Sequence, residues 1–294
     1  MKKIKLIVIS FFILTTINAQ QKDMKSKKLL IRCDDFGMCH SVNMAFQEAF
    51  ESGVPVSAST LFVCPWYQEA VEILKNYPDV SVGVHLALTS EWKNYKWGPV
   101  LGKEAVPSLV DSNGYFFYSN KLFHANNPKI EEVEKELRAQ IERALNSGIQ
   151  IDYMDAHMFT AASTPELKKL IFALAKEYKL GLSEAYEEQF VDVYDFPYEE
   201  KKSVTLSKLD SLEYGINYLL VYHLGKDTPE LQALKDMNEG GLEEISKHRQ
   251  AELNIVISDE LKEYVKKKNI QILTYREFIE GKEPVLPDEL KEEY

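Results

Sequence analysis

Cysteine is scarce in this 294-residue chain, which contains only Cys33, Cys39 and Cys64. No two of them form a CxxC pair, which argues against a structural metal cage built from thiolates. Cys33 and Cys64 lie in or beside apolar runs, which favours buried and unreactive thiols. The spacing does not say whether any two of the three form a disulfide.

Positively charged residues are fewer than negatively charged ones. Lysine and arginine total 35 against 46 aspartates and glutamates, which gives a net charge of −11. This acidic balance argues against nucleic acid or an anionic membrane as a partner and suits a neutral substrate. A glycine-rich or arginine-rich anion-binding motif is also missing, which counts against phosphoester substrates.

One long apolar run stands near the amino terminus, over residues 6–14. Lysines precede it and Ala19 follows it, which is the order of a secretory signal over residues 1–19. The run is too short for a comfortable membrane span, so none is expected after signal removal. The pattern predicts an exported protein, periplasmic or extracellular, with a linker at residues 20–28. An uncleaved amino-terminal anchor is the alternative.

Short apolar strands alternate with amphipathic helices through the rest of the chain. Strands are predicted at residues 29–35, 54–63, 80–88, 149–157, 217–224 and 270–275. Helices are predicted at residues 42–50, 66–77, 128–146 and 164–181, around Leu231, and at residues 243–268. This alternation predicts a single α/β domain at residues 29–279 with a mostly parallel sheet, followed by a tail at residues 280–294.

Polar residues end several of these strands. Asp34 and Asp35 close the first strand, and His85, His157 and His223 each fall at or near the end of another. The carboxyl ends of parallel strands meet at one edge, so these side chains are expected to converge there. A carboxylate with two imidazoles leaves coordination positions open for water and substrate, so we expect Asp35, His85 and His157 to hold a metal ion.

The remaining strand-end residues suggest acid–base roles. Asp34 is the candidate general base and His223 the candidate general acid. Asp155 shares a strand face with His157 and is expected to orient that imidazole. The donor set suits one divalent ion, zinc or magnesium, with manganese or cobalt as alternatives.

Ordinary structural roles remain open for each of these residues taken singly. Adjacent aspartates often cap a helix or lie in a solvated turn, and an isolated histidine is often a satisfied core residue. The other three histidines are predicted in loops or helices at the surface: His40, His124 and His248.

The order and spacing of several motifs resemble the YdjC-like carbohydrate deacetylases, which include the chitooligosaccharide deacetylases. The matching segments are "DDFG" at 34–37 with Asn43, "SVGVHLALT" at 81–89, the helix around 136–142, "DYMDAH" at 152–157 and "YHLGKDTPEL" at 222–231. The resemblance implies a deformed TIM-like barrel that uses a divalent metal to remove N-acetyl groups from amino sugars. It also implies the same roles for the two aspartates and three histidines as the residues suggest.

The chain departs from the family pattern after its metal histidine. The family often continues with further histidines, whereas His157 is followed here by Met158-Phe159-Thr160. An aromatic loop insertion at residues 91–120 follows the His85 strand. Trp92 and Trp97 are the expected sugar contacts of this insertion, and an aromatic mini-core that fastens the loop is the alternative.

The expected function is therefore metal-dependent hydrolysis of N-acetyl groups from amino sugars or oligosaccharides, with release of acetate. Two alternatives remain open at this point. One is a non-catalytic carbohydrate-binding protein on the same fold, and the other is a metal-dependent hydrolase of other esters. The sequence does not specify an oligomeric state and leaves a homodimer open.

Overall fold

The computed structural model describes residues 26–290. The predicted secretory signal lies outside these residues, so export stays a prediction. The first strand begins at Lys27, inside the segment predicted as a linker. The predicted tail contains a short 3-10 helix at Asp288–Leu290, and its Leu290 side chain is buried.

Within residues 26–290, eight strands form one sheet in which all pairings are parallel. The strands are β1 (Lys27–Phe36), β2 (Ser57–Thr60), β3 (Ser81–Leu86), β4 (Tyr153–Ala156), β5 (Gly181–Leu182), β6 (Gln189–Phe190), β7 (Asn217–His223) and β8 (Ile270–Leu273). Their order is β5-β4-β3-β2-β1-β7-β6, and β8 pairs with β1. No pairing in the described part of the chain joins β5 to β6, so the barrel is open there. The predicted deformed TIM-like barrel is confirmed.

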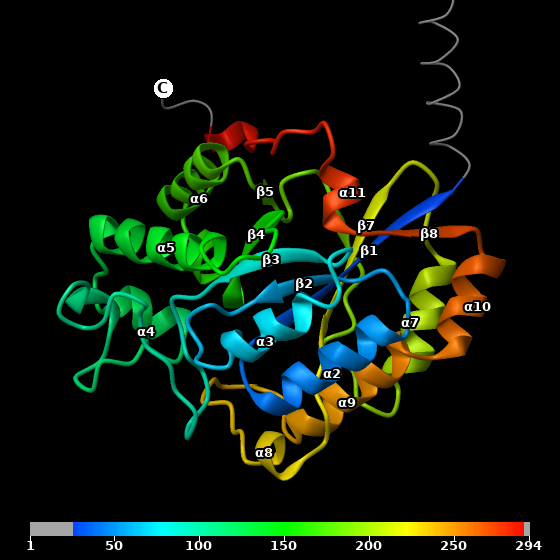
Figure 1. Ribbon diagram of the computed structural model, residues 1–294, viewed down its shortest axis with the longest axis horizontal. Coiled ribbons are helices and arrows are strands. Elements are labelled where there is room, and N and C mark those ends of the chain that lie inside the picture. The colour runs from blue at the N-terminus through cyan, green and yellow to red at the C-terminus, as the bar shows by residue number, and fades with distance from the viewer. Residues whose placement is uncertain (1–25, 291–294) are drawn as a thin grey trace, which may run out of the picture.

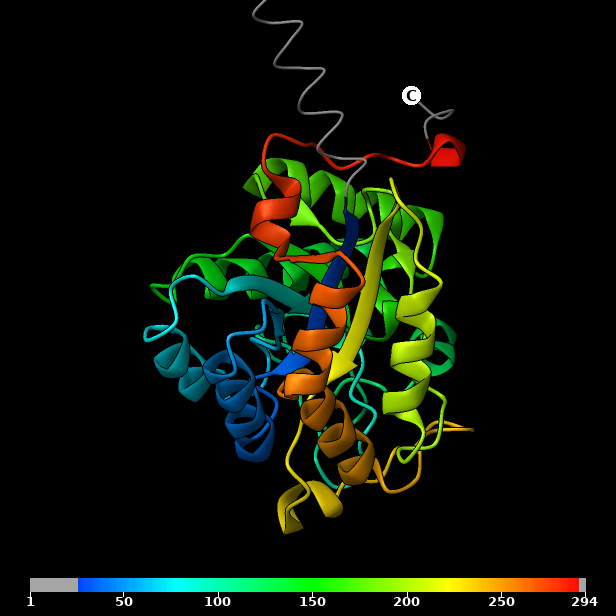
Figure 2. The ribbon, with the colours of Figure 1, turned by 90° about the vertical axis from the view of Figure 1, so that its right-hand side faces the viewer.

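Helices surround this sheet on its outer side (Figure 1). They are α2 (His40–Glu51), α3 (Tyr67–Leu74), α4 (Asn120–Ala125), α5 (Ile130–Leu145), α6 (Pro165–Tyr178), α7 (Lys201–Asp210), α8 (Pro229–Gln232), α9 (Ile245–Val256), α10 (Asp259–Lys267) and α11 (Tyr275–Ile279). Two further 3-10 helices are η1 (Pro107–Leu109) and η2 (His157–Ala162). Helices α5 and α6 lie beside β3–β5, and Figure 2 shows α7, α9 and α10 around β7. None of the described helices has the length and apolar character needed to cross a bilayer.

Two helical segments differ from the sequence prediction. The helix expected at residues 243–268 is two helices, α9 and α10, because the Ser258 hydroxyl caps a new helix by accepting from the Leu261 amide. Helix α7 was not predicted. Its buried residues include Lys201 and Thr205, so the apolar repeat that marks an amphipathic helix is missing.

Cys33 and Cys64 are free and buried, as predicted, and Cys39 is free and buried as well. Burial raises the pKa of the Cys33 and Cys64 thiols well above the usual value, which keeps them protonated and unreactive.

One large ring covers a glycine in the interior of the open barrel. Gly83 on β3 is the register partner of Tyr153 on β4, and the Tyr153 ring lies over the glycine. The Tyr153 hydroxyl lies 2.9 Å from the Ser59 hydroxyl, and its ring stacks on Tyr275 with centroids 4.4 Å apart. A side chain at position 83 would occupy the space that this ring needs.

We therefore expect Gly83→Ala to destabilise the protein by about 1–3 kcal/mol, the usual cost of overpacking a core. Its Cβ would lie 2.4 Å from two Tyr153 ring carbons. Denaturant unfolding measures the change. Gly83→Ala in a Tyr153→Leu background is the control, because without the ring the new Cβ loses the atoms that it would meet, so the same substitution should cost much less there. An equal cost in both backgrounds would contradict the packing argument.

Candidate active site

The two aspartates at the end of β1 point in different directions. Residues on a strand alternate between its faces, so Arg32 and Asp34 share the inner face. The β1–β2 register shifts between Cys33 and Phe36, and Asp35 has a left-handed backbone with φ 72°. A bulge of this kind re-aims a side chain, and here it brings Asp35 to the carboxyl-end edge of the sheet.

Each aspartate is held by its own arginine. Arg32 bonds both Asp34 oxygens, with Nε 2.8 Å from Oδ1 and Nη2 2.9 Å from Oδ2. Arg249, on α9, donates from Nη2 to Asp35 Oδ2 at 2.6 Å. Burial raises the pKa of both carboxyls, but the two arginines and the nearby histidines outweigh burial, so both pKa values lie below the usual range. Both carboxylates are therefore charged at neutral pH.

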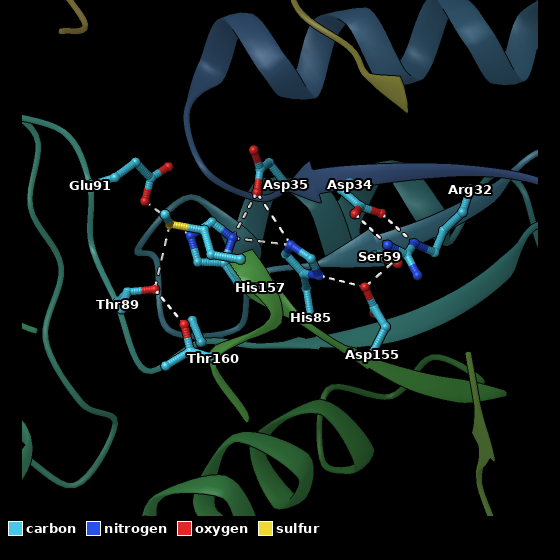
Figure 3. A network of polar contacts seen from close by, with 12 residues as sticks. Arg32, Asp34, Asp35, Ser59, His85, Thr89, Glu91, Asp155, His157 and Thr160 are labelled. Carbon is cyan, nitrogen blue, oxygen red and sulfur yellow. Dashed lines mark hydrogen bonds and ion pairs between the residues drawn. The ribbon is translucent and has the colours of Figure 1, made fainter. Parts of the chain in front are cut away.

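His85 reaches the same point from β3. Its Nδ1 lies 2.7 Å from Asp155 Oδ2, and β3 and β4 pair so that these two residues are register partners (Figure 3). The prediction that Asp155 orients His157 is wrong. Strand β4 ends at Ala156, so His157 leaves the alternating pattern and Asp155 contacts His85 instead.

His157 is oriented by Glu91, which the sequence analysis did not identify. The His157 Nε2 atom lies 3.0 Å from Glu91 Oε2 (Figure 3). The Trp97 ring packs against the imidazole with centroids 5.7 Å apart. Each histidine thus has one nitrogen on a carboxylate, which fixes the direction of the other nitrogen.

The free nitrogens meet at Asp35. His85 Nε2 and His157 Nδ1 lie 3.5 and 3.4 Å from Asp35 Oδ1, and 3.2 Å from each other. Asp35 Oδ1 is buried, and no residue within 26–290 gives it a hydrogen bond. Two imidazole nitrogens and one carboxylate oxygen facing a common point could hold a cation between them, and the donor set fits a divalent metal.

The pKa values of both imidazoles are raised, because carboxylates surround both rings. Burial lowers the pKa of His85, but Asp155 and Asp34 outweigh burial and hold it well above the usual value. Burial also lowers the pKa of His157, but Glu91 and Asp35 raise it to about 9. Without a metal ion, protons supply the charge that the carboxylates attract.

A second group of donors, Asp34, His85 and Asp155, also lies close together. An arginine already lies beside this group. The Arg32 Nε atom lies 2.8 Å from Asp34 and 3.5 Å from Asp155, so the guanidinium offsets the charge of both carboxylates, while Asp155 Oδ1 has no hydrogen-bond partner within residues 26–290. The Asp35 group is therefore the better candidate for an ion.

His223 lies beside Asp34, because the two are register partners in the β1–β7 pairing. Burial lowers the pKa of the imidazole and Arg249 lowers it further, while Asp35 and Asp34 partly oppose the shift. Its Nδ1 atom has no hydrogen-bond partner in the described part of the chain. The Tyr194 ring packs against it edge-on, with centroids 5.4 Å apart.

The position of His223 is set through its main chain. Its amide donates to Glu252 Oε2 at 2.5 Å, and the other Glu252 oxygen accepts from Lys201 Nζ at 2.5 Å. Lys201 also donates to the Tyr194 carbonyl at 2.8 Å. A fully buried ion pair thus joins α7 and α9 to the end of β7.

The two tryptophans predicted as sugar contacts are buried, each 3% exposed. Trp97 donates from its indole nitrogen to the Thr89 carbonyl, and Trp92 lies under the Arg249 guanidinium at 5.7 Å. Both rings therefore pack within the protein, as the mini-core alternative for the insertion describes, and their contact with sugar stays a prediction. His248 was predicted at the surface, but it is 7% exposed on the inner face of α9.

Several residues of the site were not identified from the sequence. Arg32 had a visible signal, since it interrupts an apolar strand two residues before Asp34 on the same face. Glu91 follows the third strand by a few residues and had no such signal. Arg249, Glu252 and Lys201 are charged residues on helices, and charges on a helix usually face solvent.

The fold and the site together define an α/β protein whose candidate active site lies at the mouth of an open parallel barrel. The family model described as YdjC-like protein matches residues 28–267. The chain belongs to this YdjC-like family.

The alignments with known relatives cover most of this chain and nearly all of each relative. A carbohydrate deacetylase of Enterococcus faecalis is 30% identical over 273 residues, which cover 86% of this chain and 98% of the relative. A carbohydrate deacetylase of Brevibacillus brevis is 28% identical over 271 residues, which cover 85% of this chain and 99% of the relative. A solved structure from Enterococcus faecalis V583, of a protein proposed to cleave cellobiose-phosphate, gives a TM-score of 0.74 at 28% identity and covers 86% and 99%.

The raised pKa of His157 predicts a pH dependence of stability for protein stripped of divalent ions. A group whose pKa rises on folding stabilises the folded state below its unfolded pKa, near 6.5, and this contribution is lost as pH rises through the folded value of about 9. The free energy of unfolding should fall by up to about 3 kcal/mol over that range. Denaturant titrations at several pH values measure the slope. An equal slope in His157→Gln would show that another group causes it.

Proposed function

We propose that this protein is a metal-dependent carbohydrate deacetylase that hydrolyses N-acetyl groups on amino sugars or oligosaccharides and releases acetate. The observation that carries the proposal is the convergence of Asp35, His85 and His157 on one point, with each imidazole oriented by a carboxylate. The relatives named carbohydrate deacetylases support the substrate class.

The chemistry of the donor set favours zinc over magnesium. Two imidazole nitrogens and one carboxylate oxygen are common zinc ligands, whereas magnesium prefers oxygen donors. A bound ion of this kind would lower the pKa of a water molecule and polarise the acetyl carbonyl.

Asp34 is the proposed general base. Arg32 fixes both of its oxygens, so the carboxylate has a defined direction and remains ionised at neutral pH. It can therefore accept the proton of the attacking water without changing its position. Its neighbour Asp35 is held away from it by the left-handed backbone, which keeps the two roles separate.

His223 is the proposed general acid. Its unpartnered Nδ1 leaves a ring nitrogen free to donate a proton to the departing amine. The lowered pKa makes the imidazolium a stronger acid but leaves the ring mostly neutral above pH 6.5. The proton that His223 donates is therefore the one that Asp34 takes from the attacking water. Asp34 and His223 are register partners on neighbouring strands, which supports a role for both on one bound acetamide.

Acetate release from a panel of acetylated amino sugars, measured with and without a chelator, tests the proposal against its alternatives. Chelator-sensitive release is the expected result. Sugar binding without release would favour the non-catalytic carbohydrate-binding protein. Metal-dependent cleavage restricted to other esters would favour the second alternative.

Replacing one aspartate at a time distinguishes the proposed roles of Asp34 and Asp35. Asp34→Asn should retain the metal and lose about 10²–10⁴ in kcat, the usual contribution of a general base. Asp35→Asn should lose both metal and activity, because the amide cannot supply the anionic donor. Metal analysis of the purified variants, alongside acetate release, gives both readouts. Loss of metal in Asp34→Asn would show that the two assignments are exchanged.

A further inference from the structure

The turn that follows His157 has a strained backbone. Met158 has φ 50° and ψ 24°, and Phe159 has φ 56° and ψ 11°, so two consecutive side-chain-bearing residues are left-handed. Each such residue is disfavoured by about 1–3 kcal/mol unless its surroundings hold it in place. Here Asn120 holds the turn, because its amide donates to the Met158 carbonyl at 3.0 Å and its oxygen accepts from Thr160.

The strained turn brings an apolar ring to the surface. The Phe159 side chain is 53% exposed, although it lies only two residues from the proposed metal ligand His157. It contacts Phe190, which is 46% exposed, with ring centroids 6.3 Å apart and planes inclined by 70°. A strained backbone and an exposed apolar ring both cost folding free energy. Strained residues cluster at functional sites, and exposed apolar patches often mark binding surfaces.

The position of the pair fits an entrance to the site. Phe159 follows β4, whereas Phe190 lies on β6, one of the two unpaired edges of the open barrel. The contact between the two rings therefore joins the segment after β4 to the edge strand β6. Two residues of chain span at most about 7 Å, so the Cα atoms of Phe159 and His157 lie within that distance of each other.

We propose that Phe159 and Phe190 form a platform for a pyranose ring of the substrate. This inference rests on the proposed function. The C–H-rich face of a pyranose is apolar and flat, and it would cover the exposed face of a phenyl ring. Neither phenylalanine has a polar atom, so the platform selects for a sugar ring without distinguishing its hydroxyl groups. The tryptophans of the 91–120 insertion are buried and leave this role open.

Binding of the N-acetylglucosamine trisaccharide tests the platform, measured by calorimetry in an Asp34→Asn background so that turnover does not interfere. Phe159→Ala and Phe190→Ala should each weaken binding about tenfold, and KM for the trisaccharide should rise similarly in the otherwise native enzyme. Phe159→Trp retains a flat ring and should bind within about twofold of the parent. Tyr214→Ala is the matched control, since Tyr214 is also 53% exposed but precedes β7 at the opposite end of the sheet.

A glycine variant separates binding from stability. Glycine adopts the left-handed conformation without strain, so Phe159→Gly should raise Tm by about 2–4 °C while weakening trisaccharide binding about tenfold. A purely structural ring would give the opposite change in stability and no change in affinity.

The outcomes distinguish the platform from the deacetylase proposal. Acetate release by the native enzyme, with unchanged trisaccharide affinity in both alanine variants, would overturn the platform alone. Ring-dependent binding without acetate release would support the platform and overturn the deacetylase. Failure of the native protein to bind or deacetylate any sugar in the panel would overturn both.

Discussion

Two neighbouring carboxylates at the end of a buried strand repel one another, and the site depends on how that repulsion is relieved. The left-handed backbone at Asp35 separates the two side chains, and each then pairs with its own arginine, Arg32 or Arg249. One Asp35 oxygen stays free to face the two histidines. The arginines thus offset the charge of the two aspartates and leave one Asp35 oxygen for the imidazole nitrogens.

Much of the fold could be predicted from the order of strands and helices. Hydrophobic periodicity is a local property, so the central strands and the long helices α5 and α6 were recognised from it. The periodicity failed where a buried face carries polar residues, as in α7 with Lys201, and where strands have only two residues, as in β5 and β6. In both cases the structure depends on contacts with distant segments.

The sequence predicted the three residues that meet at the candidate site, but it did not predict which carboxylates contact the two imidazoles. Asp35, His85 and His157 were identified because parallel strands end at one edge, which is a general property of the fold. The partner of each imidazole depends on where a strand ends and how a loop returns. This is why Asp155 contacts His85, and why Glu91 takes the place beside His157. The burial of Trp92 and Trp97 likewise follows from how their loop folds back on the barrel.

Helix α9 links the two halves of the site. Arg249 and Glu252 are three residues apart, so they project from the same side of the helix. The first bonds Asp35 on β1, and the second bonds the amide of His223 on β7. One rigid element thus sets the distance between Asp35 and His223. A shift of α9 along its axis would move both contacts at once, so distant damage to this helix would displace both side chains together.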